Sequence, residues 1–266
     1  MPSPWDDKQK PNEKSPEHGK KKDGHGPKEF GTGAKKPLKK EDAPTFTTFL
    51  TDAAATPEEK ANASLGDSEV LVTSAFPSRW LQPNRPPILN QNDTPMCVAF
   101  CNSSDQAHMD RPEYGAFPNF DESKFFYQIG GGPDGAYLSA AMAQRKEYGY
   151  PIVNVGHRGA HRIANYYQVD PTVSAIKTGL QMLPNNGSVI RLMPWYHSWF
   201  HPLTNGKLPS PDYFVSYHAI YLDGWDDNRG FRFRQSWGTS WGLNGKGYLP
   251  YVYIGRALEI WRTKDR

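Results

Sequence analysis

Cysteine is scarce in this chain: its 266 residues include only Cys97 and Cys101. The two lie four residues apart, on one face of any helix that contains both, where a disulfide would be strained and would close almost no loop. A scaffold held together by disulfides is therefore excluded, which favours the cytoplasm, or carriage in a larger assembly, as the location of the protein. We expect Cys101 to be a small buried side chain.

Long apolar runs are absent as well. No stretch approaches the roughly 18 consecutive apolar residues of a membrane-spanning helix. Residues 1–40 also lack the apolar segment that marks a secretory signal peptide. We therefore expect neither a membrane span nor a signal peptide.

Aliphatic side chains are almost missing from residues 1–43, which are rich in Lys, Gly, Pro, Glu and His. Residues 1–40 carry 11 Lys and Arg against 6 Asp and Glu, a net charge of +5, so the rest of the chain carries −2 of the total of +3. Such a composition cannot bury enough surface to offset the entropy lost on ordering. We predict a disordered basic tail over 1–43, either simply solvated or bound through its lysines to an acidic partner or nucleic acid.

The rest of the chain divides into a linker or short pro-segment-like region over 44–70 and a folded domain over 71–266. Apolar periodicity and Gly and Pro stop signals predict helices over about 96–104, 136–147 and 173–183. Strands are predicted over 188–193 and on both sides of an Asp, Asn and Gly turn near residue 228. A helical first half and a strand-rich second half indicate the α+β class.

The residues that carry chemistry lie in two distant segments. The first, QNDTPMCVAF, contains Gln91 and Cys97, and the second, YHAIYLDGWDDNRGFRFRQSWGTSWGLNGKGYLPY, contains His218 and Gln235. A thiol, an imidazole and a carboxamide are the groups that a cysteine nucleophile needs. A helix from about Met96 would place Cys97 in its first turn and favour the reactive thiolate, because a helix N-terminus carries a partial positive charge.

These segments resemble those of the papain-like cysteine peptidases. That family has a Gln six residues before its nucleophilic Cys, as Gln91 precedes Cys97, with Ala-Phe following shortly after. Its His precedes an apolar strand, as His218 does here. Its third segment reads Asn-Ser-Trp-Gly-Thr-x-Trp-Gly and then Gly-Tyr, which matches residues 235–242 and 247–248. The resemblance covers roughly residues 71–261.

The resemblance implies a two-lobed fold, in which a helical lobe carries the nucleophile and an antiparallel, barrel-like sheet lobe carries the base. It implies a cysteine endopeptidase that acts on peptide or protein substrates without a cofactor. Cys97 would attack the carbonyl, and His218 would transfer protons. Gln91 would stabilise the oxyanion, and Gln235 would orient His218.

Further roles follow from the same resemblance. Trp237 would shield the contact between His218 and the amide side chain. Gly131 and Gly132 would pair with substrate backbone, since glycine permits a close approach. Arg191 would face the pocket for the second residue before the scissile bond and would favour acidic side chains there.

Two departures from the family pattern leave alternatives open. The amide is Gln235 where the family has Asn, and Thr94-Pro95-Met96 replaces Cys-Gly-Ser before the nucleophile. An inactive papain-like binding or structural subunit, or an amidase or acyltransferase on the same fold, therefore remain alternatives to a peptidase.

No metal site is expected. The histidines of the pair His157 and His161 are four residues apart but have no third ligand. His197 and His201 have the same spacing and lie among aromatic residues. The glycine-rich turn at 130–135 lacks the Lys-Ser/Thr that follows a phosphate-binding loop.

Overall fold

A computed structural model describes residues 30–37, 76–153, 161–181 and 189–266 of the chain. Most of the predicted tail, the whole 44–70 region and His157 lie outside the described residues. A partner for the lysines of the tail therefore stays a prediction. Phe30–Pro37 is the part of the predicted disordered tail that the structure does describe, and it packs against the domain.

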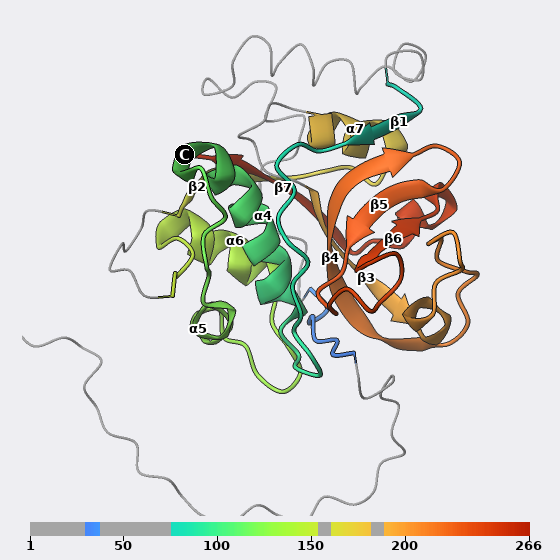
Figure 1. The fold of residues 1–266 in the computed structure, drawn as a ribbon. Coiled ribbons are helices and arrows are strands. Elements are labelled where there is room, and N and C mark those ends of the chain that lie inside the picture. The colour runs from blue at the N-terminus through green and yellow to red at the C-terminus, as the bar shows by residue number, and fades with distance from the viewer. Residues whose placement is uncertain (1–29, 38–75, 154–160, 182–188) are drawn as a thin grey trace, which may run out of the picture.

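The helical lobe consists of three helices: α4 (Cys97–Tyr114), α5 (Glu122–Gln128) and α6 (Leu138–Glu147). Helix α4 is the longest and runs through the middle of the molecule (Figure 1). It ends at Gly115, whose φ of 67° lets its N–H bond to the carbonyl of Arg111. Glycine adopts this left-handed conformation at little cost, so the residue ends the helix cleanly.

The sheet lobe is built on one antiparallel sheet with the strand order β2-β7-β3-β4-β5-β6, and β1 pairs with β4. Its strands are β1 (Arg79–Leu81), β2 (Ile163–Gln168), β3 (Val189–Tyr196), β4 (Phe214–Asp226), β5 (Gly230–Arg234), β6 (Lys246–Leu249) and β7 (Glu259–Asp265). Helix α7 (Val173–Gln181) and the 3-10 helices η1 (His197–Phe200) and η2 (Tyr251–Arg256) complete the lobe. The predicted α+β architecture is confirmed.

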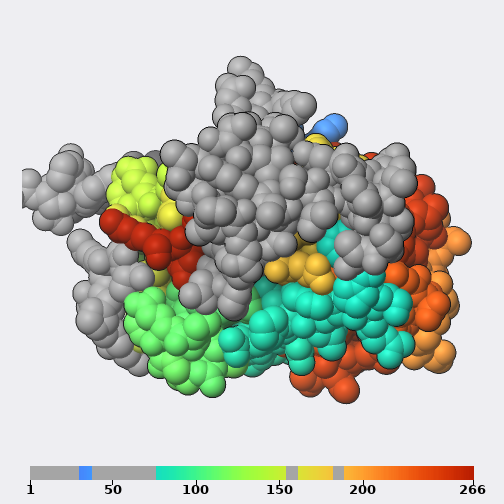
Figure 2. All heavy atoms as spheres, turned by 90° about the horizontal axis from the view of Figure 1, so that it is seen from above, coloured from blue at the N-terminus to red at the C-terminus, as the bar shows by residue number. Residues whose placement is uncertain are grey.

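Alternation along β3 divides the interior into two cores. Ile190 and Leu192 belong to the core shared with the helices, whereas Val189, Met193 and Trp195 belong to the core inside the sheet lobe. Because side chains on a strand point to opposite faces in turn, one strand serves both cores. The boundary between them is where the two lobes meet. Seen from above in Figure 2, the teal stretch that begins with β1 spans the surface between the green helices and the orange and red sheet lobe.

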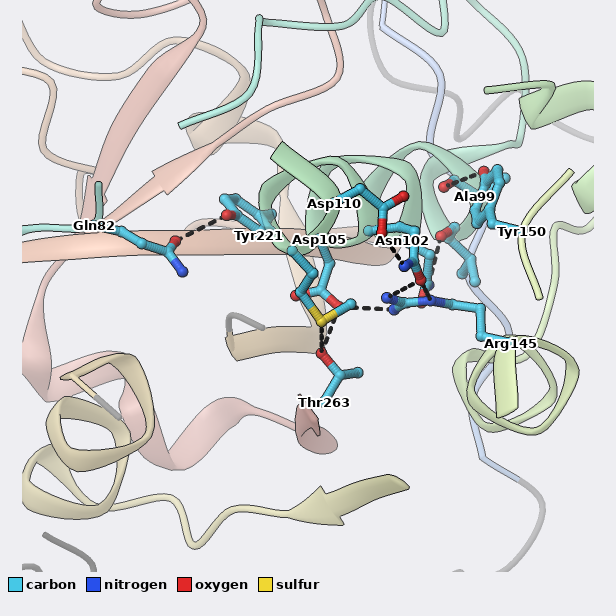
Figure 3. Close-up of polar contacts among 12 residues, drawn as sticks. Gln82, Ala99, Asn102, Asp105, Asp110, Arg145, Tyr150, Tyr221 and Thr263 are labelled. Carbon is cyan, nitrogen blue, oxygen red and sulfur yellow. Dashed lines mark hydrogen bonds and ion pairs between the residues drawn. The ribbon is translucent and has the colours of Figure 1, made fainter. Parts of the chain in front are cut away.

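A buried polar network joins the helical lobe to the end of the sheet (Figure 3). Arg145 of α6 is fully buried and forms an ion pair of 2.8 Å with Asp105 of α4. It also donates to the amide oxygens of Asn102 and Gln106, both at 2.9 Å. Thr263 of β7 donates to Asp105 at 2.6 Å. The network fixes α4, and with it Cys97, relative to α6 and β7.

The predicted helices form with shifted ends. Helix α4 begins at Cys97, one residue after the predicted start, and continues to Tyr114, and α6 begins two residues later than predicted. The predicted strand over 188–193 continues to Tyr196. Among the described residues, every helix is too short or too polar to cross a membrane.

Candidate active site

Cys97 is the first residue of α4 and is fully buried. Burial raises the pKa of its thiol to about 11, although the backbone N–H groups of Ala219 and Gly33, which face the sulfur, act in the opposite direction. The helix N-terminus alone therefore does not make this thiol reactive. The sulfur lies in a site from which water has been excluded.

His218 lies on β4 and is also fully buried. Its Nε2 lies 2.7 Å from Oε1 of Gln235, and since that oxygen can only accept, Nε2 carries the proton. Trp237 stacks on the imidazole with ring centroids 4.8 Å apart. Burial lowers the pKa of His218 to about 4, so the ring is neutral at pH 7 and Nδ1 is a free acceptor.

Gln235 therefore makes the contact that the resemblance assigned to an Asn. It follows β5, and its backbone N–H donates to the carbonyl of Gly245 at 2.9 Å. The side chain is buried, so its hydrogen bond with His218 is protected from water. The extra methylene of Gln is accommodated without loss of the hydrogen bond.

Gln91 is fixed against the strand end that carries Gln235. Its backbone N–H donates to the carbonyl of Ser236 at 2.7 Å, and the hydroxyl of Ser236 donates to Oε1 of Gln91. Nε2 of Gln91 then points the other way and donates to Thr94 at 2.7 Å and to Gly31 at 3.2 Å. Ser236, which sequence reasoning did not single out, thus orients the carboxamide predicted to stabilise an oxyanion.

A segment of the chain itself, Phe30–Pro37, crosses this site between the helices and the sheet (Figure 1, blue). The carbonyl of Gly31 accepts hydrogen bonds from the indole of Trp237 at 2.7 Å and from Gln91. Further along, Ala34 donates to the carbonyl of Tyr217 at 3.2 Å, next to His218. The prediction of a disordered tail is therefore wrong for these eight residues, because the site supplies partners for their backbone groups.

The crossing segment also pairs with the wall on the helical side. Ala136 donates to the carbonyl of Gly33 at 3.1 Å, and Lys35 donates to the carbonyl of Ala136 at 2.9 Å. The predicted backbone-binding residues, Gly131 and Gly132, do not make these contacts. Gly131 bonds to Phe126 and Gly132 to Gly135, so the turn places its later residues at the cleft.

Arg191 does not face a substrate pocket. It is fully buried on the β3 face that also carries Val189 and Met193, and its guanidinium donates to the carbonyl of Ile254 at 2.7 Å. Burial lowers its pKa to about 9. The expected preference for acidic side chains therefore has no structural basis. Strand alternation decides this: the neighbours of Arg191, and not Arg191, face the helices.

The thiol and the imidazole share one buried site, but no hydrogen bond joins them in the described part of the chain. The sulfur instead faces backbone N–H groups, and Nδ1 of His218 has no partner. Within the described ranges, no three His, Cys, Asp or Glu side chains are grouped as a metal site. His161 pairs with Asp110, and His197 with Asp212.

Comparisons with known proteins bear on the fold and the family resemblance of the chain. No protein-family model matches the chain. A protein of Blomia tropicalis described as a cysteine protease is 36% identical over 72 residues, which is 25% of this chain. The match spans only 22% of that relative's length.

Solved structures match over much more of the chain. Xylellain, a cysteine protease from Xylella fastidiosa, has a TM-score of 0.65 at 17% identity, with 90% of this chain and 97% of that chain covered. The procathepsin B S9 of Trypanosoma congolense has a TM-score of 0.66 at 15% identity, covering 89% and 87%. Bromelain from Ananas comosus has a TM-score of 0.54 at 15% identity, covering 72% and 100%. The chain has the fold of the papain-like cysteine peptidases and resembles that family.

Proposed function

We propose that this protein is a cysteine peptidase with Cys97 as its nucleophile and His218 as its general base and acid. His218 Nδ1 takes the thiol proton, and the sulfur attacks a peptide carbonyl carbon. The oxyanion that forms receives hydrogen bonds from Nε2 of Gln91 and the backbone N–H of Cys97. His218 then protonates the leaving amine, and a water that it activates hydrolyses the thioester.

The observation that carries this proposal is the way a polypeptide is held over Cys97. Gln91 and Trp237 donate to a main-chain carbonyl, while Tyr217 and Ala136 accept main-chain N–H groups. These contacts are made to main-chain groups, so they suit a polypeptide in an extended conformation. A site that binds a peptide backbone beside a thiol and an imidazole fits peptide-bond hydrolysis.

The crossing segment is not placed for its own cleavage. The carbonyl held by Gln91 belongs to Gly31, whereas the group that faces the sulfur is the N–H of Gly33. The peptide group that Gln91 holds is therefore not the one that faces the thiol, and we infer that the segment is not cleaved. We infer that Phe30–Pro37 keeps the site occupied and unreactive until it is displaced.

The test uses the full-length chain with Gly33→Val, in which a side chain displaces the segment. We expect a thiol-reactive epoxide to label Cys97 selectively at neutral pH and His218→Ala to slow that labelling at least tenfold, because the imidazole no longer takes the proton. The same protein should hydrolyse a peptide amide, with Cys97→Ser as the inactive control.

Two alternatives make different predictions. Labelling of Cys97 no faster than that of a free thiol would favour a binding subunit. The missing hydrogen bond between Cys97 and His218 is the observation that supports this alternative. Fast labelling without peptide hydrolysis would favour an amidase or acyltransferase. Either result would remove the peptidase proposal.

Gln235→Asn is expected to lower kcat about tenfold in the Gly33→Val chain and to leave KM nearly unchanged. The shorter side chain withdraws the oxygen from Nε2 of His218 by about one C–C bond, so the ring loses its orientation. Peptide hydrolysis checks this, with the exposed Gln128→Asn as a matched control. An unchanged kcat would show that Gln235 does not position the base.

A further inference from the structure

Two alternate residues of the crossing segment lie against one wall of the site. A Cβ on Gly31 would lie 2.1 Å from the carbonyl oxygen of Thr94, and a Cβ on Gly33 would lie 2.4 Å from both the Cβ and the oxygen of Pro95. A Cβ atom essentially never lies within 3.0 Å of such neighbours. The contact is almost entirely with backbone, which cannot rotate away as a side chain can.

The opposite wall of the cleft, at Gly135 and Ala136, leaves no more room for a side chain. A Cβ on Gly135, whose φ is 90°, would lie 1.7 Å from the carbonyl oxygen of Gly33. Its neighbour Ala136 forms the two hydrogen bonds to the segment. The cleft at Gly33 is therefore only as wide as one peptide backbone.

The wall that contacts the two glycines is rigid. The hydroxyl of Thr94 donates to the carbonyl of Gln91 at 2.5 Å, and Nε2 of Gln91 donates back to the carbonyl of Thr94 at 2.7 Å. Gln91 is itself bonded to Ser236, and the φ of Pro95 is fixed by its ring. The wall cannot recede without breaking the contacts that orient Gln91.

The positions between and after the glycines do accept side chains. Thr32 is half-buried, and its hydroxyl accepts a hydrogen bond of 2.6 Å from Ser216. Lys36 is exposed. The side chains of an extended peptide point alternately to opposite sides, whichever way the peptide runs through the cleft. Only every second residue of a bound peptide therefore faces the wall.

We propose that the wall Asp93–Pro95 restricts this enzyme to glycine-rich polypeptides with the pattern Gly-Xaa-Gly over Cys97. This inference rests on the proposed function, since it names the substrate class of the same site. Thr94 and Pro95 are the residues that determine the specificity. They stand where the papain-like pattern has Cys-Gly, so the restriction belongs to this chain.

The first experiment measures binding without hydrolysis. In full-length Gly33→Val protein, the peptide Phe-Gly-Thr-Gly-Ala-Lys should protect Cys97 from iodoacetamide at a concentration at least tenfold lower than Phe-Ala-Thr-Ala-Ala-Lys does. Equal protection by the two peptides would overturn the inference. If the glycine peptide alone protects and no peptide is ever cleaved, the proposed function fails and the binding preference stands.

The second experiment changes the wall. Pro95→Gly in the same chain frees the loop to move, so the preference of the glycine peptide over the alanine peptide should shrink at least fivefold. Pro171→Gly, at an exposed proline that precedes α7, should leave the preference unchanged. A preference that survives Pro95→Gly in full would show that the wall does not set it.

Discussion

Gly33→Val in the full-length chain is expected to speed the alkylation of Cys97 at pH 7.5 by about 10²-fold. The new side chain would overlap Pro95, so Phe30–Pro37 must leave the site and water returns to the thiol. A thiol with a pKa of about 11 is ionised to roughly one part in 3,000 at this pH. One at its ordinary value of about 8.5 is ionised to roughly one part in 10.

The pH dependence of the labelling rate is an independent test of whether the segment raises the pKa of Cys97. Burial raises the pKa of Cys97, so the rate of labelling in the unchanged chain should keep rising with pH towards about 11. In Gly33→Val the midpoint should move below the ordinary thiol value of about 8.5, because His218 then takes the thiol proton.

Burial lowers the pKa of His218 to about 4, so the form in which Phe30–Pro37 covers the site loses stability as the pH falls from about 6.5 towards 4. Acid should therefore help to open the unchanged chain.

The matched control is Lys36→Ala, at an exposed position of the same segment. It removes a charge without placing a new atom against the wall, so the labelling rate should stay within about twofold of the unchanged chain. Equal labelling of Gly33→Val and Lys36→Ala would show that the segment does not protect Cys97 in solution.

Arg145→Met is expected to lower the free energy of unfolding by about 3–5 kcal/mol. The guanidinium is fully buried and lies 2.8 Å from the carboxylate of Asp105, which is also buried. Removing one member of a buried ion pair leaves the other charge without its main compensation. The amide oxygens of Asn102 and Gln106 lose their donors in the same step.

Urea unfolding followed by circular dichroism measures this change. Lys146→Met, at the adjacent exposed position of α6, should shift the free energy of unfolding by less than about 1 kcal/mol. If both variants unfold at the same urea concentration, the network in Figure 3 does not hold α4 in place.

Local patterns predicted much of the site. Cys97 at a helix start, His218 on a strand and Gln235 after the next strand are each marked by their neighbours in sequence. In the structure His218 bonds to Gln235, and the backbone N–H of Ala219, the residue after His218, faces the Cys97 sulfur. The resemblance identifies Gln91, six residues before Cys97. Its partner Ser236 was within the same motif as Gln235, so the motif itself was the signal that could have identified it.

The predictions that missed depended on contacts across the chain. The resemblance assigns Arg191 to a pocket, but the face that it occupies depends on how β3 lies between β4 and β7. The resemblance assigns backbone binding to Gly131 and Gly132, whereas Ala136 makes these contacts, because sequence does not say which part of a turn reaches the cleft.

The order of Gln, Cys, His and amide along the chain, and the alternation that makes two cores, follow from the amino-acid sequence alone. The place of Phe30–Pro37 does not, since its composition argues for disorder, and it is ordered by partners such as Trp237, 206 residues away from Gly31. Composition indicates how much surface a segment can bury by itself. Here the hydrogen bonds from main-chain donors and acceptors of the cleft offset the conformational entropy that the short glycine-containing segment loses on ordering. Only the tertiary structure could therefore decide that the candidate active site is filled.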